Sequence, residues 1–252
     1  MTRRIRFNAF DMNCVAHQSP GLWRHPQDQS HRYKELGYWT ELAKLLERGR
    51  FDGIFIADVL GTYDVYGGND IAALRQGAQI PVADPLLLVS AMAAVTEHLG
   101  FGITTGTGFE HPYPFARRLS TLDHLTNGRL GWNVVTGYLP SAARNFGAAD
   151  QLDHDERYNQ ADEYLEVLYK LWEGSWEDDA VVGAGGGGGG GGAGPPRARR
   201  DLVVAHPAGP RGGRGGPAGT RARWRAGGPG ADVPRAGGDV SADRAGGAVG
   251  IS

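Results

Sequence analysis

The 252-residue chain contains little of several kinds of residue, and each scarcity excludes a class of protein. Its single cysteine, Cys14, excludes a disulfide framework and a zinc site made of several thiolates. No apolar run approaches the roughly 20 residues of a membrane-spanning helix, and the first residues contain no apolar secretion signal. The net charge of −2 predicts no strongly basic surface for nucleic acid. We therefore expect a cytoplasmic protein that binds neither membranes nor nucleic acid.

Residues 183–252 lack most of the residue types that build a folded core. Lys, Glu, Phe, Tyr and Met are absent from this segment, and Trp224 is its only aromatic residue. Gly, Ala, Arg and Pro occupy 54 of its 70 positions, and ten Arg against four Asp give it a charge of +6. Such a segment cannot bury enough apolar surface to offset the entropy lost on ordering. We predict a folded part at residues 1–182, followed by a disordered low-complexity tail.

Two interpretations of this tail follow from its composition. Gly, Ala, Arg and Pro are the amino acids of codons made only of G and C, and Arg outnumbers Lys 23 to 3 in the whole chain. The interpretation that we favour is a frameshift near codon 182 of a GC-rich gene. A natural linker or an RNA-binding Arg-Gly tail is the alternative, although such tails usually repeat a short unit that contains aromatic residues.

The folded part alternates strand-like and helical patterns. Short apolar or alternating runs predict strands at residues 5–10, 51–58, 99–105 and 129–136. Apolar residues at helical spacing predict helices over residues 38–50, 85–98 and 112–125, and a fourth that carries a stripe from Tyr158 to Trp172. Long loops are expected at residues 12–33 and 61–84.

This alternation predicts an α/β fold with a parallel sheet and right-handed crossovers. A doubly wound sheet and a TIM barrel both fit it. No Gly-x-Gly-x-x-Gly motif follows the first strand, which disfavours a dinucleotide-binding Rossmann domain. We therefore expect the first four βα units of a TIM (β/α)8 barrel, without the second half.

Polar residues at the predicted strand ends are the candidates for chemistry, because the carboxyl ends of barrel strands hold the active site. Asp11, Asp58, the run from Thr104 to Thr107, and Asn133 occupy these positions. Asp58 closes an apolar strand, where a carboxylate needs a partner. The threonines offer hydroxyls, and Asn133 offers a buried amide that must be hydrogen-bonded. Each of them also has a purely structural interpretation, as a loop cap, a strand threonine or a satisfied core amide.

His154 and Tyr158 lie one turn apart at the start of the fourth predicted helix. A helix amino terminus favours phosphate, so this pair could hold one anionic group. Taken alone, the pair is better explained as a surface histidine and a core tyrosine. Metal binding is not expected, because the other histidines lack regular ligand spacing and no His-Glu-x-x-His motif occurs. The sequence also contains no P-loop and no Gly-x-Ser-x-Gly elbow.

Several long motifs resemble those of one known family. They are NAFDMNCVAH, FDGIFIAD, FARRLSTLDHLTNGR, GWNVVTGYLPSAARN, HDERY and YKLWEGSWEDDAV. They resemble the flavin-dependent monooxygenases of the bacterial-luciferase superfamily, and the resemblance covers residues 4–182 almost continuously. Within it, the chain is similar to the nitrilotriacetate, alkanesulfone and dibenzothiophene-sulfone monooxygenases, and most of all to the large subunit of dimethyl-sulfide monooxygenase.

The resemblance implies a barrel that takes reduced FMN from a separate NAD(P)H-dependent flavin reductase. It implies that dioxygen reacts at flavin C4a to give a peroxide, which oxidises a small organosulfur or alkyl substrate. By position, Asp58, Thr104 and Asn133 match flavin-contacting residues. His154 and Tyr158 match residues on the phosphate side. No residue is assigned a catalytic role.

The resemblance also bears on substrate contacts and on the shortened barrel. The loops at residues 12–33 and 61–84 are expected to be the walls of the substrate site, with His17 and Trp23 as contacts. A half barrel exposes a sheet edge and apolar helix surface, so we expect an unstable or aggregating chain that binds FMN poorly. An inactive fragment and a deazaflavin-dependent oxidoreductase on the same scaffold are the alternatives. Relatives are often dimers or tetramers, so a homo-oligomer is also expected.

Overall fold

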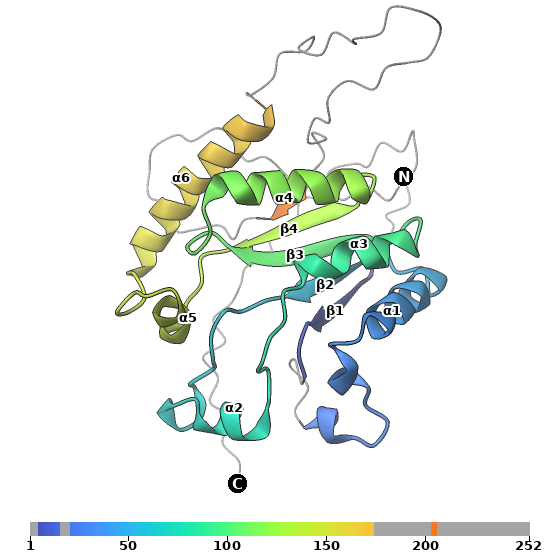
Figure 1. Ribbon diagram of the computed structural model, residues 1–252, viewed down its shortest axis with the longest axis horizontal. Coiled ribbons are helices and arrows are strands. Elements are labelled where there is room, and N and C mark those ends of the chain that lie inside the picture. Colours follow the sequence, from blue (N-terminus) through green and yellow to red (C-terminus); the bar gives the residue numbers. More distant parts are fainter. Residues whose placement is uncertain (1–4, 16–20, 174–202, 206–252) are drawn as a thin grey trace, which may run out of the picture.

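The computed structural model describes residues 5–15, 21–173 and 203–205. A five-stranded parallel sheet forms the centre of this part, and its strands lie side by side in chain order (Figure 1). The strands are β1 (Asn8–Met12), β2 (Gly53–Ala57), β3 (Gly100–Gly106), β4 (Leu130–Val135) and β5 (Val203–Ala205). Each neighbouring pair is parallel, so the carboxyl ends of the strands share one edge.

Helices connect the successive strands and pack in a row against the sheet (Figure 1). The long helices are α1 (Leu36–Arg48), α3 (Leu86–Ala94), α4 (Pro112–Leu125) and α6 (His154–Glu173). Each contacts the next in this series, because α1 meets α3, α3 meets α4, and α4 meets α6. Two short helices, α2 (Ile71–Gln76) and α5 (Pro140–Asn145), lie in the connections after β2 and β4. No helix in the described ranges is long and apolar enough to cross a bilayer.

The order of the strands decides between the two topologies that fit the sequence pattern. A doubly wound sheet reverses its strand order at a switch point and carries helices on both faces. A barrel instead adds each strand beside the previous one, with the helices in one outer layer. Here β1 to β4 follow one another and their helices form a single row. The prediction of an α/β fold made of barrel-type βα units is therefore confirmed.

Most of the predicted elements are present, and several have shifted ends. The helix predicted at residues 112–125 has these bounds in the structure. The second, third and fourth predicted strands differ from β2, β3 and β4 by one or two residues at each end. The bounds predicted for the first strand were wrong, since β1 begins at Asn8 and continues to Met12. Asp11 therefore lies inside a strand and not after it.

Short elements account for most of what the sequence pattern did not predict. Helices α2 and α5 and three 3-10 turns are too short to show a helical period, and the predicted loops contain all of them except α5. β5 lies in the segment predicted to be disordered, and it pairs with β4 through residues 203–205. The rest of that segment, residues 183–202 and 206–252, lies outside the described residues, so its disorder stays a prediction.

The hydrophobic core lies between the sheet and the row of long helices. Alternate strand residues face the helices and are buried: Ile54, Ile56, Phe101, Ile103, Leu130, Trp132 and Val134. α6 contributes one apolar stripe, formed by Ala161, Leu165 and Leu168. The strand residues between these face the opposite side of the sheet, where Phe10 and Phe55 stack with ring centroids 5.1 Å apart.

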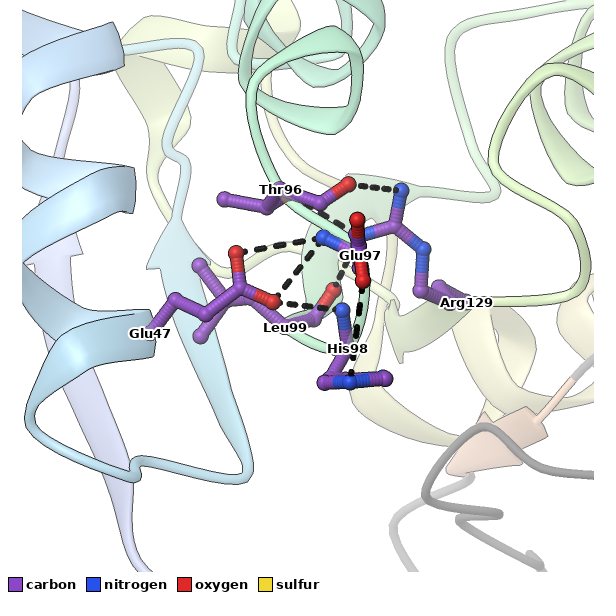
Figure 2. A network of polar contacts seen from close by, with 6 residues as sticks. All are labelled: Glu47, Thr96, Glu97, His98, Leu99 and Arg129. Atoms are coloured by element: carbon purple, nitrogen blue, oxygen red, sulfur yellow. Dashed lines mark hydrogen bonds and ion pairs between the residues drawn. The ribbon is translucent and has the colours of Figure 1, made fainter.

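Arg129, which directly precedes β4, joins the amino-terminal edge of the sheet to the end of α3 (Figure 2). The residue is only 8% exposed, and burial lowers the pKa of its guanidinium. Its nitrogens donate hydrogen bonds of 2.9–3.1 Å to the hydroxyl of Thr96 and to the carbonyl oxygens of Ala93, Thr96, Leu99 and Thr126. One side chain thus satisfies the backbone groups that would otherwise be buried without a donor.

Glu47, in the last turn of α1, extends this network to the turn between α3 and β3 (Figure 2). Its carboxylate accepts hydrogen bonds from the Glu97 N–H at 2.9 and 3.1 Å and from the His98 N–H at 2.6 Å. Glu47 and Arg129 therefore hold α1, α3, β3 and β4 in one fixed arrangement.

We expect the Arg129→Gln substitution to lower the free energy of unfolding by at least about 3 kcal/mol, because it leaves several buried carbonyl oxygens without a donor. Urea unfolding followed by circular dichroism measures the change. Arg117→Gln, at an exposed position of α4, is the matched control and should alter stability by no more than about 0.5 kcal/mol. Equal midpoints for the two variants would show that the network contributes little.

Candidate functional site

The loops at the carboxyl ends of β2 and β4 form one wall of the candidate site. A Cβ at Gly61 would lie 2.5 Å from Ser141 Oγ and 2.7 Å from the Ala142 nitrogen, so only glycine allows this approach. Ser141 Oγ accepts a hydrogen bond from the Thr62 N–H at 2.9 Å and donates one to the Thr62 carbonyl at 3.0 Å. These contacts fix the loop after β2 against α5.

An apolar cavity of about 140 Å³ lies against this wall. Asp58, which directly follows β2, is the one carboxyl group among its lining residues. Tyr63 and Tyr138 add hydroxyls, and burial, followed by a hydrogen bond with Tyr138, raises the pKa of Tyr63. Gly106 and Gly137 line the cavity where β3 and β4 end. An apolar hollow with a few placed polar groups is typical of a small-molecule site.

Asp58 and Asp11 are the carboxyl groups that burial perturbs most in this region. Burial raises the pKa of Asp58 from 3.8 to about 6, and the hydrogen bond from the Val59 N–H at 2.9 Å only partly opposes it. Burial likewise raises the pKa of Asp11 to about 6, against a hydrogen bond from the Met12 N–H. Either side chain can therefore carry a proton close to neutral pH.

The Cys14 thiol lies near both carboxyl groups and is not a reactive group. Burial first, and then the charges of Asp11 and Asp58, raise its pKa to about 12. A thiol of this kind stays protonated, and only the thiolate is a nucleophile or a metal ligand. Within the described ranges, no group of three or more His, Cys, Asp or Glu side chains could hold a metal ion.

Thr104 and Asn133 meet on the face of the sheet opposite to the helices. They are register partners in β3 and β4, and Asn133 Nδ2 donates a hydrogen bond to Thr104 Oγ1 at 3.1 Å. Thr104 is buried and Asn133 is half-buried. The structure thus brings these two predicted residues together as one polar pair, although neither lines the cavity of Asp58.

A second cavity, of about 380 Å³, lies between the ends of β3 and β4 and the start of α6. Phe109 lines both cavities, and its ring stacks on that of Phe146 with centroids 4.5 Å apart. Gly137 has a φ of 72°, and a Cβ there would lie 3.3 Å from Gln151 Nε2 and 3.8 Å from the Phe109 ring. The two cavities therefore adjoin at Phe109 and Gly137.

His154 and Tyr158 lie beside one another on α6, but neither lines these two cavities. Their ring centroids are 4.7 Å apart, and His154 Nδ1 lies 2.9 Å from Asp155 Oδ1. The His154 side chain is 57% exposed. The structure therefore pairs His154 with Tyr158, and it does not place them around the cavity that contains Asp58.

Of the two predicted substrate contacts, only Trp23 lies within the described residues. Trp23 belongs to the 3-10 turn Leu22–Arg24, and the Arg24 guanidinium carbon lies 4.7 Å from the centroid of its ring. It lines neither cavity. His17 lies outside the described residues, so its role stays a prediction.

The family follows from comparison with known proteins. The profile described as Luciferase-like monooxygenase matches residues 13–185. The chain belongs to the luciferase-like monooxygenase family. It is 64% identical over 182 residues to the long-chain alkane monooxygenase of Geobacillus thermodenitrificans (strain NG80-2). It is 65% identical over 181 residues to the dimethyl-sulfide monooxygenase of Hyphomicrobium sulfonivorans. The resemblance that the motifs indicated is confirmed.

These alignments cover 72% of the luciferase-like chain, but only 41% and 38% of the two relatives. The chain thus spans about two fifths of the length of the curated relatives it matches. The crystal structure of long-chain alkane monooxygenase (LadA) is similar with a TM-score of 0.70 and 64% identity, over 72% of this chain and 42% of that one. A riboflavin lyase (RcaE) crystallised with modified FMN and riboflavin has a TM-score of 0.66 and 40% identity, over 71% and 40%.

Sequence reasoning missed three residues of the luciferase-like chain that line the larger cavity: Phe109, Gln151 and Arg157. Arg157 lies within the HDERY motif, so its position in the sequence was a signal, but only the structure shows that the side chain is half-buried. Phe109 and Gln151 lie in loops without a period. Only the fold shows that all three meet at one cavity.

The raised pKa values predict a pH dependence of stability. Because the folded chain holds protons on Asp11 and Asp58 that the unfolded chain releases above pH 4, the stabilisation is complete below about pH 4 and is lost as the pH rises through 6. We expect the Asp11→Asn/Asp58→Asn variant to gain free energy of unfolding relative to the parent between pH 4 and 7, by less than about 1.4 kcal/mol per pKa unit.

Urea unfolding at a series of pH values measures this difference. Glu163→Gln, at an exposed position of α6, is the control and should follow the parent at every pH. Parallel curves for the parent and the double variant would contradict the prediction.

Proposed function

We propose that this chain belongs to an enzyme that uses reduced FMN and dioxygen to oxidise a small organosulfur or alkyl compound. The observation that carries the proposal is the apolar cavity at the strand ends, with Asp58 as its one carboxyl group. Membership of the luciferase-like family supports the reaction class. The alkane and dimethyl-sulfide monooxygenases among its relatives support the substrate class, and dimethyl sulfide is the specific candidate.

The cavity of about 140 Å³ is too small for a whole flavin ring, so the described residues would hold one edge of it. Gly106 and Gly137 line the cavity beside Asp58 without side chains of their own. A Cβ at Gly137 would lie 3.8 Å from the Phe109 ring and would occupy part of the space between them. On this proposal Asp58 holds the polar edge of the ring. Thr104 and Asn133 offer a hydroxyl and an amide on the adjoining face of the sheet.

When bound, reduced FMN would supply the oxygen activation that side chains cannot perform. The residues of this chain would orient the ring and keep the site dry. Phe109, Tyr138 and Leu139 would exclude water from it. Asp58, with its pKa of about 6, can donate or accept a hydrogen bond at the polar edge of the ring near neutral pH.

The proposal includes a partner protein and a cellular location. Reduced flavin would come from a separate NAD(P)H-dependent flavin reductase, in the cytoplasm where NAD(P)H is available. A homo-oligomer is also proposed. Trp23 and His17 remain the candidate substrate contacts, on the loop that follows β1.

One alternative is an inactive fragment of such an enzyme. It is supported by the alignments, which cover about two fifths of the length of each of the two relatives, and by the change of composition after residue 182. The exposed Phe10 on the inner face of the sheet, at 51%, supports it as well, because this face is the interior of a closed barrel. In this alternative the domain at residues 1–182 is half a barrel, and the tail is out-of-frame sequence.

The FMN proposal predicts that the purified chain binds FMN, in contrast to the poor binding expected of a half barrel. It also predicts that Asp58→Ala weakens this binding at least about tenfold, equivalent to about 1.4 kcal/mol. Quenching of flavin fluorescence measures the affinity. Asp64→Ala is the matched control, because Asp64 lies in the same loop and does not line the cavity. Equal losses for both variants would count against a flavin beside Asp58.

This titration and a turnover assay together separate the candidate functions. Oxygen-dependent loss of dimethyl sulfide with a flavin reductase, NADH and catalase supports the monooxygenase. Poor FMN binding without turnover supports the inactive fragment. Binding of a deazaflavin in place of FMN supports a deazaflavin-dependent oxidoreductase on this scaffold.

The frameshift interpretation makes a prediction about the gene. A second reading frame beyond codon 182 is expected to encode alternating strand and helix patterns that continue the barrel. Sequencing of the genomic DNA around this codon checks it. If every frame there encodes only low-complexity sequence, the interpretation is wrong.

A further inference from the structure

The four barrel-type βα units of this chain form an open arrangement with two ends. Within the described ranges, β1 is an outer strand of the sheet, and α1 and α6 lie at opposite ends of the row of helices (Figure 1). A closed barrel of this type has eight strands, twice the number that these units supply. We propose that a second copy of this chain closes the barrel. In this dimer, β1 of each copy pairs with β4 of the other, and α1 of each packs against α6 of the other.

The edge of β4 already accepts a parallel strand in the required position. β5 lies there, and its three residues pair with Gly131, Trp132 and Asn133. β1 has five residues and pairs in parallel with β2 along all of them. A β1 strand from a second copy would replace β5 with a longer partner and would keep the parallel direction of the sheet.

β1 directs backbone groups to its outer edge. The Phe7 N–H donates to Asp52 Oδ2 at 2.9 Å, and the Phe7 carbonyl accepts a hydrogen bond from the Asp52 N–H at 2.8 Å. The backbone groups of Phe7 therefore point toward β2. Consecutive residues of a strand point these groups in opposite directions, so the N–H and carbonyl of Asn8 point to the outer edge, where an incoming strand can bond with them.

The side of α6 that would meet the second copy is acidic. Tyr164 faces α4, because its ring centroid lies 6.1 Å from that of Phe115. Consecutive helix residues are about 100° apart, so residues two before, two after and nine after Tyr164 lie on the side turned away from α4. The exposed residues at these positions are Asp162, Glu166 and Glu173. Lys170, which lies 2.6 Å from a carboxylate oxygen of Glu166, offsets only one of these charges.

The side of α1 that would meet α6 is basic. Glu47 faces the end of α3 through its bonds to the turn that follows that helix, and Arg48 and Glu41 lie roughly 100–120° around α1 from it. Glu41 is 3.7 Å from a guanidinium nitrogen of Arg32, which balances its charge. Arg48 and the following Arg50 are exposed and form no ion pair with another described residue. The two flanks therefore have complementary charge.

Exposed apolar side chains also lie on the surfaces that would become buried. Leu45, on the side of α1 turned away from α3, is 56% exposed. Phe10 is 51% exposed on the inner face of the sheet, which is the interior of a closed barrel. The strand register places Phe10, Phe55, Gly102 and Gly131 in one row on this face. Phe10 of a second copy would lie beside Gly131, which has no side chain of its own to fill the space.

The segment that follows α6 is a poorer occupant of these surfaces. Residues 183–252 contain one aromatic residue, and Gly, Ala, Arg and Pro fill 54 of their 70 positions. A segment with so few large apolar side chains cannot cover the inner face of a sheet and the flanks of two helices. A second copy supplies both surfaces at once, with the opposite charge on the helix that meets each flank.

The first test addresses the strand contact in the purified 252-residue chain without added flavin. Light scattering after gel filtration should give twice the mass of one chain, and the mass should stay at this value as the concentration rises. Asn8→Pro should raise the dissociation constant of the dimer at least about tenfold, because proline removes the N–H donor from the outer edge. Asn8→Ala, which keeps this donor, is the matched control and should leave the constant unchanged.

The second test addresses the helix contact by charge exchange. Arg48→Glu/Arg50→Glu gives α1 the charge of α6, and Glu166→Lys/Glu173→Lys gives α6 the charge of α1. Each double variant alone should dimerise at least about tenfold more weakly than the parent, because like charges then face each other. An equimolar mixture of the two should recover the dissociation constant of the parent, because each α1 then meets an α6 of opposite charge. This recovery would also show that both variants are folded.

Three results would overturn the proposal: a monomer at every concentration, a dimer that Asn8→Pro and both charge variants leave intact, or association that continues beyond two copies. The last result excludes a closed barrel, because such a barrel has no free edge. If Asn8→Pro loses the circular dichroism of the parent, the charge exchange alone decides. A dimer of a chain that does not bind FMN would support this proposal and count against the flavin proposal, so the two can fail separately.

Discussion

The hydrogen bonds of Arg129 hold the amino-terminal edge of the sheet, and the geometry of the opposite edge depends on them. A buried guanidinium is tolerated there because five acceptors surround it, from the end of α3 to the start of β4. Glu47 attaches α1 to the same turn. These contacts fix the carboxyl-terminal end of α3 against the start of β4, and in the register of β3 with β4 Thr104 lies opposite Asn133. The loops that follow these strands then begin from defined positions.

At the carboxyl-terminal edge, two cavities of different chemistry adjoin. The smaller has apolar and aromatic walls and one carboxyl group, Asp58, whose pKa of about 6 reflects its burial. The larger has two buried donors without acceptors, on Arg157 and Gln151. Phe109 separates them and is held by its stacking on Phe146.

Glycine controls how closely the loops approach one another around these cavities. At Gly61, the missing Cβ lets the loop after β2 contact the backbone of α5. At Gly137, a positive φ and the missing Cβ make room for the Gln151 amide. The same elements leave the inner face of the sheet open on the side of β1, where Phe10 remains 51% exposed beside Phe55. The chain thus combines a rigid outer wall with an inner face that a closed barrel would cover.

The sequence by itself determined the alternation of strands and helices, because each buried face imposes a period on its apolar residues. It also determined the family, since the motifs carry many residues in a defined order. The short helices α2 and α5 could not be predicted, because six residues make fewer than two helical turns, and neither could the three-residue strand β5. The extension of β1 to Met12 was missed because strand ends depend on pairing with a neighbour.

For the candidate site, the sequence indicated Asp58, Thr104, Asn133, His154 and Tyr158 as polar residues at strand or helix ends. Only the tertiary structure decided their neighbours: Thr104 bonds to Asn133, whereas Asp58 and His154 do not share either cavity. Arg157 and His154 are three residues apart on α6, yet one faces a cavity and the other faces solvent. The direction of a side chain depends on how its helix rotates against the sheet. That rotation is set by packing between segments distant in the sequence, which no local pattern records.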